Sequence, residues 1–274
     1  MGTLYLVATP IGNLEDMSPR AVRILREAKL IAAEDTRHTR QLLTHFDLHT
    51  PLTSYYEHNK LTKQETILTA LAQGDVALVS DAGTPAINDP GYELVKAALE
   101  AGHRVSPVPG PSAPIAALAA SGLPTDAFLY LGYLPRKTSE RKSLFEQVGQ
   151  HPYTLIFLES PHRVLDSLTD LEAFLGDREM AAARELTKVY EQFVRGRISQ
   201  VRAYFAENEP RGEFVLILSG QKTGEPAQWT EPDLVKAIQP ALKTGKPAKE
   251  LAAELARQSG WSKRDVYALI NQVK

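Results

Sequence analysis

The sequence contains no cysteine, which excludes disulfide bonds, thiolate-bound zinc and a catalytic thiol. Its seven histidines are scattered without the spacing of metal ligands, so we expect no metal site. No apolar run approaches the roughly 18 residues of a membrane helix, and the chain begins with a strand-like segment rather than a signal peptide. These absences predict a cytoplasmic protein that does not contact membranes.

A general excess of basic residues is also missing, since the formal net charge is −2. A nucleic-acid-binding protein usually carries a basic surface, so the distribution of charge matters here. Residues 230–274 hold eight Lys and Arg against five Asp and Glu, a net charge of +3 that leaves −5 for the rest. A second small basic cluster consists of Arg136, Lys137, Arg141 and Lys142. Any contact with nucleic acid is expected in these two places.

Two phosphate-binding motifs are absent as well. The first strand-like segment is not followed by G-x-G-x-x-G, and G-x-x-x-x-G-K-S/T occurs nowhere in the chain. Chemistry based on nicotinamide cofactors or nucleoside triphosphates is therefore disfavoured.

With 274 residues and 43% hydrophobic content, the chain can build two sizeable cores. Strand patterns alternate with helix patterns, which is typical of an α/β protein. Strands are expected at residues 4–8, 30–33, 76–80, 105–108, 128–131, 153–158, 180–184 and 214–218. Helices are expected after Ser18-Pro19, from Asp89-Pro90 to Gly102, and at residues 112–120, 139–148, 161–175, 198–206, 232–243, 247–259 and 262–272.

Three loops of small residues follow predicted strands, at residues 9–13, 80–91 and 109–113. Ligands of open α/β sheets bind at the carboxyl ends of strands, and small residues let a ligand approach the backbone. The alternative for the longest loop is a long capped turn, for which Gly, Pro and Asp also suffice. Together the three loops favour a ligand-binding cleft at one edge of one sheet.

Seven segments, in this order along the chain, are similar to those of a known family: VATPIGNLEDMS, AAEDTRHT, SDAGTPAINDPGY, PGPSA, FLESPHR, ARELTK and GEFVLIL. Together they resemble the small-subunit ribosomal RNA methyltransferase I family, which belongs to the tetrapyrrole-methylase-like group. The resemblance implies a homodimer that uses S-adenosyl-L-methionine to methylate the ribose 2′-hydroxyl of a decoding-region cytidine. It also implies two α/β domains with the cofactor in the cleft between them, plus a small helical C-terminal domain. We place these three domains at residues 1–121, 122–222 and 230–274, with a connection at 122–126.

By the same resemblance, the cofactor should contact residues in the three loops and in the second domain. They are Pro10, Asp81, Gly83, Ala86, Ile87, Ser112, Ala113, Phe157, Leu158, Thr187, Glu213 and Phe214. Core packing is an equally good interpretation of Phe157, Leu158 and Phe214, because these three stand in apolar strands. The first two loops also lack the glycine-rich and Gly-Asp-Pro forms of the tetrapyrrole-modifying branch, which argues against a tetrapyrrole substrate.

Methylation of a weakly acidic hydroxyl requires a group that removes its proton. Ionisable residues are dense at 34–38 and at 56–59, and Asp35 and His58 are the candidate bases. An internal ion-pair network that fixes a loop would explain the same residues. Arg37 and Arg40 could instead hold phosphates.

The C-terminal segment resembles a helix-turn-helix pair, with Ser262 as the N-cap of the last helix. Such a unit can bind nucleic acid. A helical cap that buries Leu251, Leu255, Val266 and Ile270 is compatible with that interpretation.

Two other functions stay open at this point. One is a methyltransferase of the same fold that acts on a tetrapyrrole or a protein. The other is a non-catalytic ribosome-assembly factor that only holds the cofactor. The expected partner in the main hypothesis is small-subunit ribosomal RNA or the assembled 30S subunit.

Overall fold

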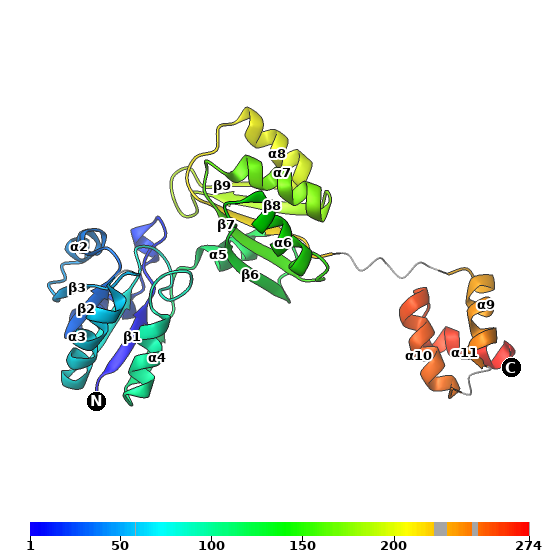
Figure 1. Ribbon diagram of the computed structural model, residues 1–274, viewed down its shortest axis with the longest axis horizontal. Coiled ribbons are helices and arrows are strands. Elements are labelled where there is room, and N and C mark those ends of the chain that lie inside the picture. The colour runs from blue at the N-terminus through cyan, green and yellow to red at the C-terminus, as the bar shows by residue number, and fades with distance from the viewer. Residues whose placement is uncertain (58, 222–228, 243–245, 274) are drawn as a thin grey trace. The chain divides into compact units, whose positions relative to one another are not determined.

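The computed structural model describes residues 1–57, 59–221, 229–242 and 246–273 (Figure 1). The chain forms two compact units. The first comprises residues 1–149 and 153–219, and the second comprises residues 150–152 and 220–274. We describe each unit by itself.

The first sheet of the first unit is entirely parallel, and its strands lie in the order β3-β2-β4-β1-β5. Their bounds are β1 Thr3–Val7, β2 Leu30–Ala33, β3 Leu52–Ser54, β4 Val76–Val79 and β5 Arg104–Val108. The connection after β1 passes over β4 to reach β2, whereas the connection after β4 passes over β1 to reach β5. A crevice forms where two such connections diverge, at the carboxyl ends of the strands. The topology therefore locates a binding crevice beside β1 and β4.

Helices cover both faces of this sheet and bury the alternating side chains of its strands. They are the 3-10 helix η1 Leu14–Asp16 and the α-helices α1 Pro19–Glu27, α2 Thr36–His45, α3 Lys60–Gln73 and α4 Tyr92–Glu100. In β2, Ile31 packs in the cluster that contains α1, whereas Ala32 packs in the cluster that contains α3 and α4. The predicted cap at Ser18 is confirmed, because the Ala21 N–H donates to Ser18 Oγ at 3.1 Å.

The second sheet is mixed, in the order β6-β7-β10-β8-β9. Only β6 and β7 run parallel, and the other neighbours are antiparallel. The bounds are β6 Phe128–Tyr133, β7 Thr154–Glu159, β8 Glu179–Arg184, β9 Gln192–Arg197 and β10 Phe214–Leu218, with helices α5 Ala113–Ser121, α6 Thr138–Val148, α7 Val164–Leu175 and α8 Ile198–Glu207.

Helix α5 packs against this second sheet, where Ala117 and Leu118 join Ile156 and Val215 in one apolar cluster. Helices α6, α7 and α8 contribute to the cluster on the other face. The predicted domain of residues 1–121 placed α5 with the first sheet, and the packing differs from that expectation. The predicted domain bounds otherwise stay a prediction.

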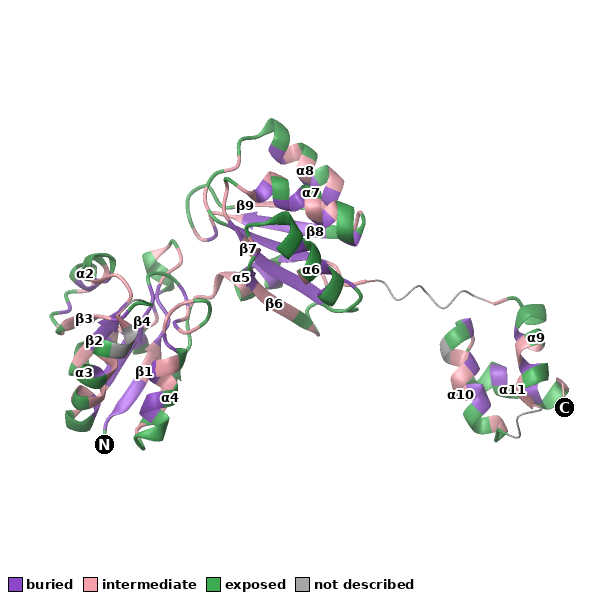
Figure 2. Cartoon of the chain, in the orientation of Figure 1, coloured by how far each residue is buried: buried purple, intermediate pink, exposed green. Residues whose placement is uncertain are grey.

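The second unit contains three helices in its described part, α9 Glu231–Leu242, α10 Ala248–Ser259 and α11 Lys263–Val273. They share a core that includes Leu251, Leu255, Val266 and Ile270, as expected for a helical cap (Figure 2). Ser262 caps α11, since its hydroxyl accepts the Asp265 N–H at 3.1 Å. In the described ranges, no helix is both long and apolar enough to cross a membrane.

Candidate functional site

The three predicted loops meet at the carboxyl edge of the first sheet. The Thr9 N–H donates to the Gly83 carbonyl at 2.9 Å, and the Gly83 N–H donates to the Thr9 carbonyl at 3.0 Å. The Thr84 hydroxyl donates to the Pro111 carbonyl at 3.1 Å. These bonds join the loop after β4 to the loops after β1 and β5, so the predicted convergence is confirmed.

The loop after β4 turns through three left-handed residues, Gly83 at φ +82°, Ala86 at +67° and Asn88 at +64°. The left-handed conformation costs an L residue about 1–2 kcal/mol, which glycine avoids. Strain of this kind concentrates at functional sites. The polar backbone groups of Gly83 already bond to Thr9. Gly83 therefore shapes the loop. The composition had indicated a backbone open to a ligand, but the backbone N–H and carbonyl of Gly83 are already bonded to Thr9.

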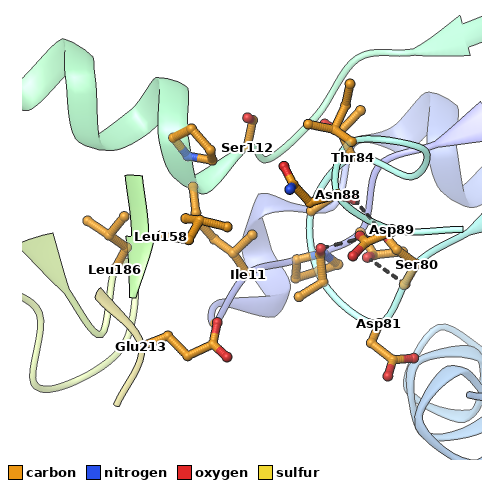
Figure 3. Close-up of a pocket in the computed structure, with 18 of the residues that line it drawn as sticks. Ile11, Ser80, Asp81, Thr84, Asn88, Asp89, Ser112, Leu158, Leu186 and Glu213 are labelled. Carbon is orange, nitrogen blue, oxygen red and sulfur yellow. Dashed lines mark hydrogen bonds between the residues drawn. The ribbon is translucent and has the colours of Figure 1, made fainter. Parts of the chain in front are cut away.

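A cavity of about 730 Å³ opens beside these loops and is lined from both sheets (Figure 3). Ile11, Ser80, Asp81 and Ser112 come from the loops of the first sheet. Leu158, Leu186 and Glu213 come from the second sheet and its loops, which with helices α5 to α8 we call the second lobe, the first sheet and its helices being the first lobe. A volume of this size is ordinary for a cofactor or substrate pocket.

Most of the predicted cofactor residues line this cavity. They are Pro10, Asp81, Gly83, Ile87, Ser112, Ala113, Leu158, Glu213 and Phe214. The lining does not include Ala86, Phe157 or Thr187.

Phe157 is fully buried in the core of the second lobe, where its ring packs edge-on against that of Phe145 with 6.0 Å between the ring centroids. Successive residues of a strand face opposite sides, so Phe157 and its neighbour Leu158 cannot both face the cavity. For Phe157 the core-packing interpretation therefore holds. Among the described residues, the buried hydroxyl of Thr187 has no hydrogen-bond partner, and it lies against Gly12.

The cavity is lined by more carboxylates than cations. Glu34, Asp81, Asp89, Glu185 and Glu213 all line it. Burial raises the pKa of Glu34, and the nearby Asp89 and Asp81 raise it further. Burial also raises the pKa of Asp89 despite its hydrogen bond from Ser80, and Asp81 and Glu213 act in the same direction. The crowded negative charge favours a positively charged ligand.

Two tyrosines of β6 complete the wall and stay neutral at physiological pH. Burial raises the pKa of Tyr130 to about 12, with a contribution from Asp89. Burial likewise raises the pKa of Tyr133 to about 12, assisted by Glu213. The Tyr133 hydroxyl donates to Glu213 Oε2 at 3.2 Å. Both tyrosines are therefore suited to donating hydrogen bonds rather than accepting a proton.

Asp35, one of the two predicted bases, caps α2 instead of facing the cavity. Its carboxylate accepts the Arg37 N–H at 2.8 Å and the Arg37 Nη2 at 2.7 Å. These bonds from Arg37 lower the pKa of Asp35 to about 2, which makes it a weak base. The ion-pair interpretation thus describes Asp35 better. His58, the other predicted base, lies outside the described residues.

Helix α2 separates the cavity from a second, smaller hollow. His38 and Thr39 line the cavity, Arg37, Arg40 and Thr44 line the hollow, and Gln41 lines both. Arg37 is engaged by Asp35, whereas the Arg40 guanidinium has no partner within the described part of the chain. Of the two predicted phosphate-binding arginines, Arg40 is the one that is free to bind.

The sequence prediction did not single out Glu34, Asp89, Tyr130 or Tyr133 as site residues. The signal for Glu34 was its position at the carboxyl end of β2, directly before the residue that caps α2. Asp89 was expected to cap a helix, but α4 begins at Tyr92 with Gly91 as its N-cap. Asp89 is thereby left to line the cavity.

A family model described as "Tetrapyrrole (Corrin/Porphyrin) Methylases" matches residues 3–202. Among curated proteins, the chain is similar to "Ribosomal RNA small subunit methyltransferase I" of Halalkalibacterium halodurans, with 47% identity and coverage of 99% of this chain and 95% of the relative. The proteins of the same name from Synechocystis sp. and Escherichia coli O157:H7 are also 47% identical, covering 98% and 97% of this chain and 97% and 93% of theirs.

Two solved structures share the fold. One is uroporphyrin-III C-methyl transferase from Thermus thermophilus in complex with S-adenyl homocysteine, at a TM-score of 0.54 and 22% identity, covering 80% of this chain and 98% of that one. The other is diphthine synthase, at a TM-score of 0.61 and 13% identity, covering 80% and 90%. At these identities the likeness concerns the fold alone.

Proposed function

This chain belongs to the tetrapyrrole methylase family and, within it, to the ribosomal RNA small subunit methyltransferase I family, and we propose that it methylates small-subunit ribosomal RNA. The methyl donor is S-adenosyl-L-methionine, and the acceptor is the ribose 2′-hydroxyl of a cytidine in the decoding region. The observation that carries the proposal is the 47% identity to proteins of that name over nearly the whole chain.

The cavity fits the methyl donor by charge and size. S-adenosyl-L-methionine carries its methyl group on a positively charged sulfonium and supplies the electrophile. The carboxylates of Asp81, Asp89 and Glu213 suit such a cation, and about 730 Å³ accommodates a molecule of this size. Ser112 and Ala113 at the start of α5 add hydrogen-bonding groups to the same wall.

For proton removal we propose Glu34 in place of Asp35. Glu34 lines the cavity, and burial together with Asp89 and Asp81 raises its pKa. A carboxylate with a raised pKa is a stronger base than Asp35, whose pKa is about 2. A role for His58 stays a prediction.

The RNA is expected to contact cations outside the acidic cavity. Arg40 on α2 is available for a phosphate, and the second unit carries the basic excess of the chain. A homodimer in the cytoplasm, acting on the RNA or on the 30S subunit, belongs to the same proposal.

The alternative substrates differ in what they require of the site. A tetrapyrrole methylase of this fold is represented among the solved structures, but the first two loops here depart from the glycine-rich and Gly-Asp-Pro forms of that branch. An assembly factor that holds the cofactor without reaction would need the same cavity and no base.

The test uses small ribosomal subunits from a strain that lacks this protein, incubated with the purified protein and S-adenosyl-L-methionine labelled in the methyl group. Subunits from the parent strain, which already carry the modification, are the matched control. We expect label only in the former, at one cytidine whose 3′ linkage resists alkaline hydrolysis because its 2′-hydroxyl is blocked.

Label on a base would contradict 2′-O specificity. Cofactor binding without transfer to either preparation would favour the assembly factor.

A further inference from the structure

Residues 134–137 directly follow Tyr133, the last residue of β6, which lines the cavity. Arg136 and Lys137 are exposed. Lys137 Nζ pairs with Glu140 Oε1 at 3.2 Å, whereas the Arg136 guanidinium has no partner in the part of the chain that the structure describes. Arg136 is therefore free to bind an anion without first losing an ion pair.

A buried arginine holds the backbone of this segment in place. Arg141 is only 4% exposed. Its Nη1 donates to the carbonyls of Pro135 at 3.1 Å and of Arg136 at 2.8 Å, while its Nε donates to Asp170 Oδ2 at 2.7 Å. Although Arg141 belongs to the basic cluster of the sequence, it cannot reach a partner molecule.

A second arginine fixes the start of the segment. Arg163 Nη1 donates to the Leu134 carbonyl at 3.2 Å, and its Nη2 pairs at 2.6 Å with Glu159 Oε1. Glu159 is fully buried and also accepts the Ser167 hydroxyl at 2.5 Å. Buried charged groups with several hydrogen bonds are rigid, so residues 134–137 have a fixed backbone although the side chains of Arg136 and Lys137 are exposed.

The position of the segment relates it to the cavity. Tyr133, which lines the cavity, directly precedes it, so the Cα atom of Arg136 lies at most about 11 Å from that of Tyr133. The carboxylates inside the cavity repel the phosphates of an RNA whose nucleotide enters it. A cation carried by a fixed backbone beside Tyr133 compensates for that repulsion, and a guanidinium matches the geometry of a phosphate.

We propose that Arg136 binds a phosphodiester group of the substrate RNA beside the cavity, and that Arg141 and Arg163 are positioning residues for it. The inference rests on the proposed function, since it names how the RNA is held at that site. Phosphate contacts of this kind fix the register of a nucleic acid on a protein.

The test compares Arg136→Ala with Arg104→Ala. Arg104 is also exposed and has no side-chain partner in the described ranges, but it begins β5, at the sheet edge opposite the three loops. Binding to unmodified small subunits is measured between 0.05 and 0.5 M salt, roughly the range in which phosphate contacts respond. Removing one phosphate contact should reduce the salt slope by about 0.7–0.9 and weaken binding about five- to eightfold at 0.1 M salt.

We expect this change in Arg136→Ala alone, with partial rescue in Arg136→Lys and unaltered affinity for S-adenosyl-L-methionine in all variants. If the wild type methylates the subunits, but Arg136→Ala and Arg104→Ala have the same subunit affinity and the same salt slope, the proposal is overturned. Absence of methylation by the wild type would instead count against the proposed function.

Discussion

Gly83 offers the sharpest test of the cofactor site, because its effect is separable from that of a general loss of stability. The residue adopts φ +82°, and both of its polar backbone groups bond to Thr9. A Cβ at Gly83 would lie 3.4 Å from Ile11 Cγ2, which is ordinary contact. For the added Cβ the penalty of Gly83→Val is therefore mainly conformational, about 1–3 kcal/mol for a residue in a sparsely populated region.

That strain acts on the loop that lines the cavity. If the loop leaves its native conformation to relieve the strain, only a fraction of the molecules can bind, and the apparent affinity falls by that fraction. A strain of 1–3 kcal/mol corresponds to roughly a 5- to 150-fold loss of affinity for S-adenosyl-L-methionine. The protein should stay folded, since domains of this kind have about 5–15 kcal/mol of stability.

Gly122→Val is the matched control. Gly122 has the same φ of +82°, and no atom of the described residues lies within 4 Å of an added Cβ. It follows α5 at the end opposite Ser112, about 15 Å away by the rise of an α-helix. Its valine should lower the free energy of unfolding by a similar amount and leave the affinity unchanged.

Calorimetric titration with S-adenosyl-L-methionine and urea unfolding of both variants decide the matter. If the two folded variants bind the cofactor equally well and near the wild-type affinity, the loop after β4 does not form the cofactor site.

Three further outcomes follow from the site and its supports. Glu34→Gln should slow single-turnover methylation at least about 100-fold, whereas Asp35→Asn should stay near the wild-type rate. Because a protonated carboxyl cannot accept a proton, the wild-type rate should fall as the pH drops below the raised pKa of Glu34, and rates measured across pH should lack that limb in Glu34→Gln. Glu159→Gln should lower the free energy of unfolding in urea by about 3 kcal/mol, because it leaves Arg163 without its buried partner. Glu172→Gln, in a partly exposed pair, should lower it by less than about 1 kcal/mol. A chain ending at Gly220 should keep its cofactor affinity, since the cavity is lined by the first unit. It should bind small ribosomal subunits more weakly and with a flatter salt dependence. An unchanged salt slope would contradict a role for the second unit in RNA binding.

The convergence of the three loops was predictable because it depends only on chain direction. Each loop follows a buried parallel strand, and the carboxyl ends of parallel strands lie at one edge. The Ser18 and Ser262 caps were predictable for a similar reason, since a hydroxyl before a helix has a local partner.

Elements without a local signature were missed. Strand β3 has three residues, all half-buried, and β9 is an edge strand with the sequence QFVRGR. Both segments become strands because they pair with a neighbouring strand, and this pairing cannot be predicted from the local sequence. Helices α2 and α3 were missed as well, because the polar start of α2 was interpreted as a catalytic cluster.

The detailed site required geometry for a different reason. Asp35 and Glu34 are adjacent and chemically alike, yet one caps a helix and the other lines the cavity. Phe157 and Leu158 likewise face opposite sides of β7. A shift of one residue changes the role of a side chain, and composition does not resolve that shift.

Helix α5 links ligand concentration to the stability of both lobes. Its first residues, with Ser112, line the cavity beside the loops of the first sheet, whereas Ala117 and Leu118 are part of the core of the second. A ligand that binds only the native arrangement, present at 100 times its Kd, stabilises the folded chain by about 2.7 kcal/mol. Because the ligand is released when either lobe unfolds, its binding stabilises both lobes. The temperature at which this protein unfolds therefore rises with the supply of its methyl donor.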